Sequence, residues 1–152
     1  MDKSRGKLGG ETLHQYKTRI IDPISKSYCA AKWYNATIWL GHGQTTSCHH
    51  PPGHWIPVEE LKDNPSAIHN TPHKKKMRKM MLEGERPSEC EYCWKVEDMG
   101  RDNISDRVFK TEIFKDSDIQ KSVDMPWDNN VNLKTLEISF DRACNFKCSY
   151  CN

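Results

Sequence analysis

The sequence predicts an α+β fold that depends on bound metal, because it has little apolar material for a core. The 152 residues have a mean hydropathy of −0.87, and only 36% of them are hydrophobic. Seven cysteines supply ligands whose binding to metal can stabilise such a chain. Short helix and strand patterns alternate with glycine- and proline-rich turns, which is typical of a small mixed domain.

The first third of the chain is expected to hold a mobile arm and then a loop-rich region. Residues 1–20 are polar and are expected to form the arm. Residues 36–40 have the composition of a short strand, and Gly43 favours a hairpin that leads into Cys48. The Asn64-Pro65 pair opens a short helix in this interpretation.

Two helices and one strand are predicted further along. A helix over about 73–83 would place three methionines on one face, and Gly84 stands at its C-cap position. Pro87-Ser88-Glu89 has the pattern of the first turn of the next helix, which carries two cysteines and ends near residue 100. Residues 101–130 are expected to be irregular, and residues 133–140 alternate as a strand does.

The seven cysteines divide into three near the C-terminus and four upstream. The last three are Cys144, Cys148 and Cys151, with the spacing C-x-x-x-C-x-x-C. A structural zinc site and an ordinary iron–sulfur cube each take four protein ligands, so three cysteines suggest a cube with one iron open to another ligand. The upstream four are Cys29, Cys48, Cys90 and Cys93.

The strand and loop from Leu136 to Cys151 resemble the first barrel strand and cluster loop of the radical SAM superfamily. Asn145 after the first cysteine and Tyr150 before the last both match the common form of that motif. The resemblance implies that Cys144, Cys148 and Cys151 hold a 4Fe-4S cluster, and that Tyr150 lies against the adenine of S-adenosyl-L-methionine. Buried structural cysteines and a zinc site completed by a distant ligand are the alternatives.

The resemblance also implies an activity. In this superfamily the reduced cluster cleaves S-adenosylmethionine to methionine and a 5′-deoxyadenosyl radical, which abstracts hydrogen from a substrate. It further implies an electron donor such as flavodoxin or ferredoxin. The chain ends one residue after Cys151, so it is expected to be a truncated N-terminal piece of such an enzyme, inactive by itself.

The upstream cysteines are similar to those of the SPASM and twitch auxiliary-cluster domains of radical SAM enzymes. Thirteen residues separate Cys29 from Gly43, four separate Gly43 from Cys48, and a CxxC pair follows at Cys90 and Cys93. No further cysteine precedes Cys144, which fits the single-cluster twitch type better than SPASM. In most relatives this domain follows the barrel, whereas here it precedes it. Many relatives modify peptides, so a peptide or protein substrate is expected by analogy.

The resemblance implies that Cys29, Cys48, Cys90 and Cys93 bind a second, auxiliary 4Fe-4S cluster. From the residues alone zinc remains an alternative, because CxxC pairs serve both metals. The predicted organisation is a mobile arm over 1–20, a twitch/SPASM-like domain over 21–110, a linker over 111–132 and the start of the radical SAM core over 133–152. The last part corresponds to the first strand and cluster loop of a truncated α/β partial barrel.

A second hypothesis comes from another class of protein: a zinc-stabilised module that binds nucleic acid or protein without catalysis. The basic run over 74–79 could bind RNA, although a solvated helix face opposite the methionines is the simpler interpretation. His42, His49, His50 and His54 surround Cys48 and could offer a metal ligand, with a solvated loop as the alternative.

The balanced charge argues against a nucleic-acid-binding protein, and the absence of long apolar runs argues against a membrane-spanning protein. A formal net charge of +2 gives no nucleic-acid footprint, so binding to nucleic acid is not expected. The polar start has no apolar segment behind it, and no apolar run approaches the ~18 residues of a membrane span. The expected compartment is the cytoplasm, where clustered cysteines bind metal rather than pair as disulfides.

Overall fold

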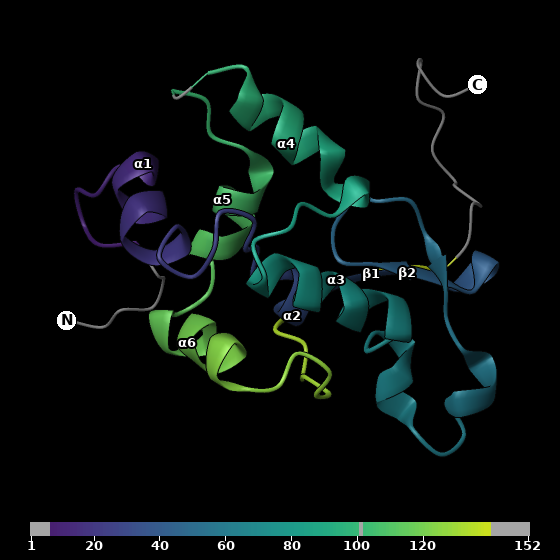
Figure 1. The fold of residues 1–152 in the computed structure, drawn as a ribbon. Coiled ribbons are helices and arrows are strands. Elements are labelled where there is room, and N and C mark those ends of the chain that lie inside the picture. Colours follow the sequence, from purple (N-terminus) through teal and green to yellow (C-terminus); the bar gives the residue numbers. More distant parts are fainter. Residues whose placement is uncertain (1–6, 101, 141–152) are drawn as a thin grey trace.

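The computed structural model describes residues 7–100 and 102–140. Within these residues the chain forms six α-helices and one four-stranded mixed sheet (Figure 1), which confirms the α+β class. The strand order is β3-β2-β1-β4. In the described part of the chain, no helix is both long enough and apolar enough to cross a membrane.

A hairpin forms the centre of the sheet, as the sequence predicts. Strands β1 (Asn35–Trp39) and β2 (Gln44–Thr46) pair in antiparallel fashion. They are joined by the 3-10 turn η2 (Leu40–His42) and by Gly43, whose φ of 62° lies in the left-handed region. Glycine adopts this conformation without a Cβ clash, which explains its place at the turn. Strand β3 (His54–Trp55) extends the sheet beside β2.

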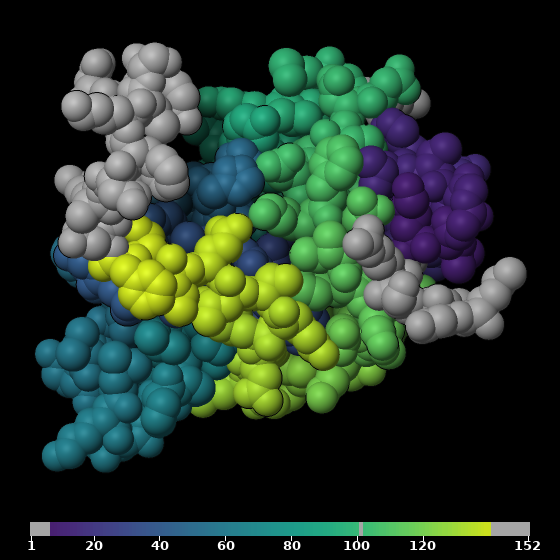
Figure 2. All heavy atoms as spheres, turned by 180° about the vertical axis from the view of Figure 1, so that it is seen from behind, coloured from purple at the N-terminus to yellow at the C-terminus, as the bar shows by residue number. Residues whose placement is uncertain are grey.

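Strand β4 (Thr135–Ser139) lies within the strand predicted over 133–140, and it pairs in parallel with β1 along its whole length. Because Leu136 and Ile138 stand opposite Ala36 and Ile38 in the register, they share the same face of the sheet. Ala36 and Ile38 are buried, whereas Leu136 and Ile138 are 50% and 41% exposed. The end of the described chain, yellow in Figure 2, accordingly lies on the surface.

The prediction of a mobile arm over residues 1–20 is wrong for residues 13–20, which are helical. Helix α1 (Leu13–Tyr16) continues directly into the π-helical turn η1 (Lys17–Ile21). Thr12 caps α1 with a reciprocal capping box, and the Tyr16 side chain is completely buried. The polar composition hid this helix because only one of its faces is apolar.

Helix α3 (Pro72–Leu82) confirms the helix predicted over 73–83. Thr71 caps its N-terminus by accepting a 3.1 Å hydrogen bond from the backbone N–H of Lys74. At the C-terminus Gly84 has a φ of 80°, and the N–H of Glu85 donates to the carbonyl of Met80 at 2.8 Å. These two features form a Schellman motif, which explains the glycine.

The helix that carries the CxxC pair is also present. A 3-10 turn, η5 (Ser88–Cys90), leads into α4 (Glu91–Asp98). The prediction that residues 101–130 are irregular is wrong, because α5 (Asp106–Glu112) and α6 (Asp116–Asp124) lie there. Three short elements complete the fold. Helix α2 (Ala31–Tyr34) comes directly before β1, and the 3-10 turns η3 (Val58–Glu60) and η4 (Pro65–Ile68) follow β3.

The segment predicted as a linker, residues 111–132, packs into the main core. Phe114, Ile119 and Val131 are buried there together with aromatic residues from the N-terminal half. A smaller cluster beneath the sheet is made of Ala36, Ile38 and Ile56. The helices after residue 105 therefore belong to the same packed body as the cysteine-bearing segments, as Figure 1 also shows.

Two basic residues of the run over 74–79 are buried, which corrects the expectation of a solvated face. The Lys74 Nζ donates to the carbonyl of Asn35 at 2.6 Å. Arg78 donates to the carbonyls of Lys32 and Asn129 and to the Asn70 side chain, at 2.9 to 3.1 Å. Helix α3 thus uses these two side chains to satisfy backbone carbonyls of the interior.

We predict that Arg78→Ala destabilises the fold by about 3 kcal/mol, because it removes the Arg78 hydrogen bonds to the carbonyls of Lys32 and Asn129 and one of the two donors to the Asn70 side-chain oxygen. Lys76→Ala, on the exposed side of the same helix, is the control and should change the free energy of unfolding by less than about 0.5 kcal/mol. Urea denaturation of both variants checks this. Equal midpoints for the two would contradict the structural role of Arg78.

Candidate metal centre

The four upstream cysteines, which lie far apart in the sequence, line one cavity. Cys29 precedes α2, Cys48 follows β2, Cys90 ends η5, and Cys93 lies in the first turn of α4. All but Cys48 are buried, and all four are free thiols. The structure therefore brings together the upstream residues that the sequence selected.

Each cysteine-bearing segment is fixed through the residue directly before a cysteine. The Arg107 Nη1 donates to the carbonyl of Tyr28 at 3.0 Å. The Asn35 side-chain amide donates to the carbonyl of Ser47 at 2.6 Å. Glu89 accepts from the buried Lys32 ammonium. The cavity is consequently held in shape by polar contacts next to the thiols.

Arg107 makes the most extensive of these contacts. Its Nε and Nη2 donate to the two carboxylate oxygens of Glu97 at 2.6 and 2.8 Å, while its side chain is almost completely buried. Burial alone would raise the pKa of Glu97, but the hydrogen bonds and charge of Arg107 hold that pKa below its usual value. The guanidinium also lies 5.7 Å from the ring centre of Trp94 on α4. Arg107 thereby joins α5 to α4 and to the segment of Cys29.

Backbone N–H groups near three of the four sulfurs favour their thiolate forms. The N–H of Ala31 acts to lower the pKa of Cys29, and that of His50 acts to lower the pKa of Cys48. The backbone N–H of Arg107 acts in the same direction on the pKa of Cys93, while the Ser105 hydroxyl donates to Glu97. Donors of this kind stabilise thiolates and adjust the potential of metal centres bound to them.

Burial raises the pKa of all four thiols. It raises the pKa of Cys29 to about 12 and that of Cys90 to about 11, and it raises those of Cys48 and Cys93 as well. The thiols are therefore protonated at neutral pH until a cation replaces the protons. A buried set of four sulfurs suits soft metals such as zinc and the iron of iron–sulfur clusters.

The remaining predicted site residues lie outside the described residues. These are Cys144, Cys148, Cys151 and Tyr150. Strand β4 ends at Ser139, five residues before Cys144 in the sequence. The cluster and adenine contacts that the resemblance implies for these residues remain predictions.

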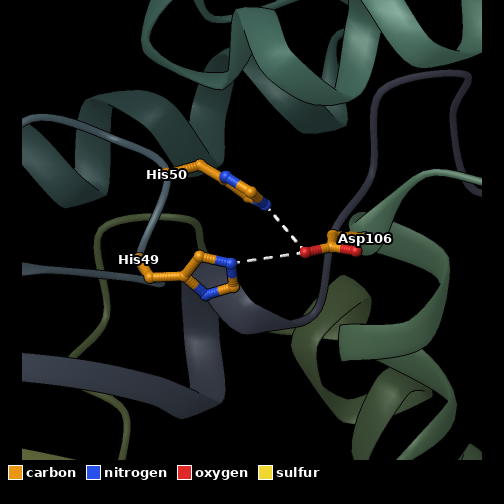
Figure 3. A group of neighbouring side chains, drawn as sticks. All are labelled: His49, His50 and Asp106. Atoms are coloured by element: carbon orange, nitrogen blue, oxygen red, sulfur yellow. Dashed lines mark hydrogen bonds and ion pairs between the residues drawn. The ribbon is translucent and has the colours of Figure 1, made fainter. Parts of the chain in front are cut away.

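Sequence reasoning missed several residues around the cavity. Arg107, Lys32 and Glu89 had no motif to mark them, because their partners come from distant segments. The histidines near Cys48 were noticed, but their partner Asp106 lies more than fifty residues further on. His49, His50 and Asp106 converge at the edge of the cavity (Figure 3).

No protein-family model matches the sequence, and neither a curated protein nor a solved structure matches the chain.

We predict that Arg107→Lys destabilises the protein by about 2–3 kcal/mol, since lysine keeps the charge but cannot reach Glu97 and Tyr28 together. Arg86→Lys is the matched control. Arg86 also pairs with a carboxylate, that of Asp98, and lies over Trp94, but the pair is exposed. It should cost less than about 0.5 kcal/mol. Thermal and urea unfolding measure both, and a cost at Arg86 as large as at Arg107 would contradict this account.

Proposed function

We propose that this chain is part of a radical SAM enzyme and carries its auxiliary-cluster domain together with the loop for the S-adenosylmethionine-binding cluster. The observation that carries the proposal is the spacing of Cys144, Cys148 and Cys151 directly after a strand. Three cysteines leave one corner of a cube open for a ligand from outside the protein. When bound, such a cluster supplies the electron that cleaves S-adenosylmethionine for hydrogen abstraction.

The surroundings of β4 support its assignment as the first strand of a parallel sheet. It pairs in parallel with β1, and parallel strands occur mainly in sheets that are covered on both faces. Its Leu136 and Ile138 are exposed on one face, and Phe140, directly after the strand, is exposed as well. An apolar row at a free sheet edge is suited to contact with further strands and helices of a core.

The upstream sulfurs do not form a ready-made tetrahedral zinc site. Tetrahedral zinc with Zn–S bonds near 2.3 Å holds its sulfurs about 3.8 Å apart. In the described residues only the group of His49, His50 and Asp106 brings three or more ligand atoms within 4.8 Å of one another, so no three cysteine sulfurs do. A cube accommodates wider spacing because each cysteine binds a different iron.

The protein groups around this cavity are suited to an anionic centre. Burial alone would lower the pKa of Lys32, but Cys90, when it is a thiolate, and the Glu89 carboxylate raise it, so its ammonium stays charged beside a bound anionic centre. The backbone donors of Ala31, His50 and Arg107 add positive dipoles. These groups would stabilise a buried cluster that transfers single electrons or holds the fold together.

The rival hypothesis, a zinc-stabilised module that binds nucleic acid or protein, has less support. Its proposed contact surface was the basic run of α3, yet Lys74 and Arg78 from that run are buried. A peptide or protein substrate and a flavodoxin or ferredoxin donor fit the enzyme hypothesis and rest on the resemblance alone.

Anaerobic reconstitution with iron and sulfide tests the proposal. We expect about eight irons per chain for two cubes. The reduced full-length enzyme that includes this chain should change its EPR spectrum when S-adenosylmethionine is added, and it should release 5′-deoxyadenosine under strong reductant. The triple variant Cys144→Ala, Cys148→Ala, Cys151→Ala should retain about four irons and lose both responses.

The double variant Cys90→Ser, Cys93→Ser is the complementary control and should keep the spectral response to S-adenosylmethionine. An unchanged spectrum together with no nucleoside product from the wild-type full-length enzyme would sink the proposal. A colourless protein with one tightly bound zinc would favour the rival module.

A further inference from the structure

We propose that His49, His50 and Asp106 form a second metal site, separate from the cysteines, which binds a divalent transition metal such as Zn²⁺. Their three ligand atoms lie within 4.8 Å of one another. Both imidazoles point their Nε2 atoms at one carboxylate oxygen, Asp106 Oδ2, from the opposite side of the site (Figure 3). None of the three is a cysteine, so this site stands or falls independently of the proposed function.

The distances already approach those of a bound metal. With Zn–N and Zn–O bonds of 2.0–2.2 Å, neighbouring ligand atoms of a tetrahedral site lie about 3.4 Å apart. The His49 Nε2 is 3.4 Å from Asp106 Oδ2, and the His50 Nε2 is 2.7 Å from the same oxygen. The shorter contact is a hydrogen bond, which a metal would replace after a small rotation of the His50 ring.

The fold holds two of the ligands in place. The His50 ring stacks on Tyr92 with centroids 3.9 Å apart and an interplanar angle of 16°. Asp106 is the first residue of α5, directly before Arg107, which Glu97 fixes. Ligands that are held before binding lose less conformational freedom when the metal arrives.

The third ligand, His49, is open to solvent. The His49 side chain is 54% exposed, while that of His50 is 16% exposed. Metal can therefore enter from the surface without opening the cysteine cavity. Three protein ligands leave a fourth position for water or a substrate atom, which is the pattern of reactive rather than structural zinc sites.

The chemistry of the donors separates this site from its neighbour. Two imidazoles and a carboxylate suit Zn²⁺, Fe²⁺ and related ions, whereas the four thiols prefer softer partners. A simple ion pair would need only one histidine beside Asp106. Here two consecutive histidines turn toward the same oxygen, although their rings lie only 4.0 Å apart and would repel each other if both were charged.

Zinc binding to the reconstituted protein tests this inference, with Zn²⁺ itself as the probe. We expect one zinc per chain in competition with a chromophoric chelator. Zinc X-ray absorption should show only nitrogen and oxygen neighbours at about 2.0–2.2 Å, with the multiple scattering of imidazole. His49→Ala and Asp106→Asn should each weaken binding of this zinc at least tenfold.

The matched control is His42→Ala, which removes an exposed histidine from the same region and should bind zinc as the wild type does. Circular dichroism verifies that the variants fold, and His49 is exposed enough for its removal to be tolerated. No bound zinc, a sulfur-only shell near 2.3 Å, or equal affinity in His49→Ala and His42→Ala would each overturn the inference.

Discussion

The arrangement of the cysteine cavity depends on the buried ion pair of Arg107 and Glu97. A guanidinium offers several donors in one plane, and here they reach from α5 to Glu97 on α4 and to the carbonyl of Tyr28 at once. Breaking such a pair leaves an uncompensated charge inside the protein, which is why its geometry is strongly constrained. The loop of Cys29 and the helix of Cys93 are consequently placed relative to each other before any metal is considered.

The same principle explains how a chain of such low hydropathy forms a core. Lys74, Arg78 and Arg107 lie inside and donate hydrogen bonds to backbone or side-chain oxygens of the interior. Their alkyl parts fill volume while their charged ends make directed contacts. A polar interior of this kind tolerates little change, because each removed donor leaves an acceptor without its hydrogen bond.

Local patterns in the sequence were sufficient to predict the elements with clear signals. The methionine spacing and Gly84 predicted α3, alternation predicted β4, and Gly43 predicted the hairpin. Cysteine spacing selected the four residues that line the cavity. The helix, strand and hairpin signals each come from residues close together in the sequence. The cavity could be predicted because cysteine is a residue type with few structural roles.

The failures concern features that depend on distant partners. Helices α5 and α6 have short polar sequences whose stability comes from packing against the N-terminal half, so their periodicity was weak. The burial of Lys74 and Arg78 could not be predicted from the sequence, because a run of charged residues normally faces water. Asp106 and Arg107 gain their roles only after folding brings them to segments many residues earlier.

The parallel pairing of β1 with β4 has a consequence for biosynthesis. Asn35 and Thr135 are partners in the ladder but are a hundred residues apart. At 5–20 residues per second, a ribosome needs roughly 5–20 s to deliver the later strand after the earlier one. During that interval one side of β1 presents open hydrogen-bonding groups, a form that invites pairing with foreign strands. The nascent chain must therefore shield this edge, or have it shielded by a chaperone, until its own partner is made.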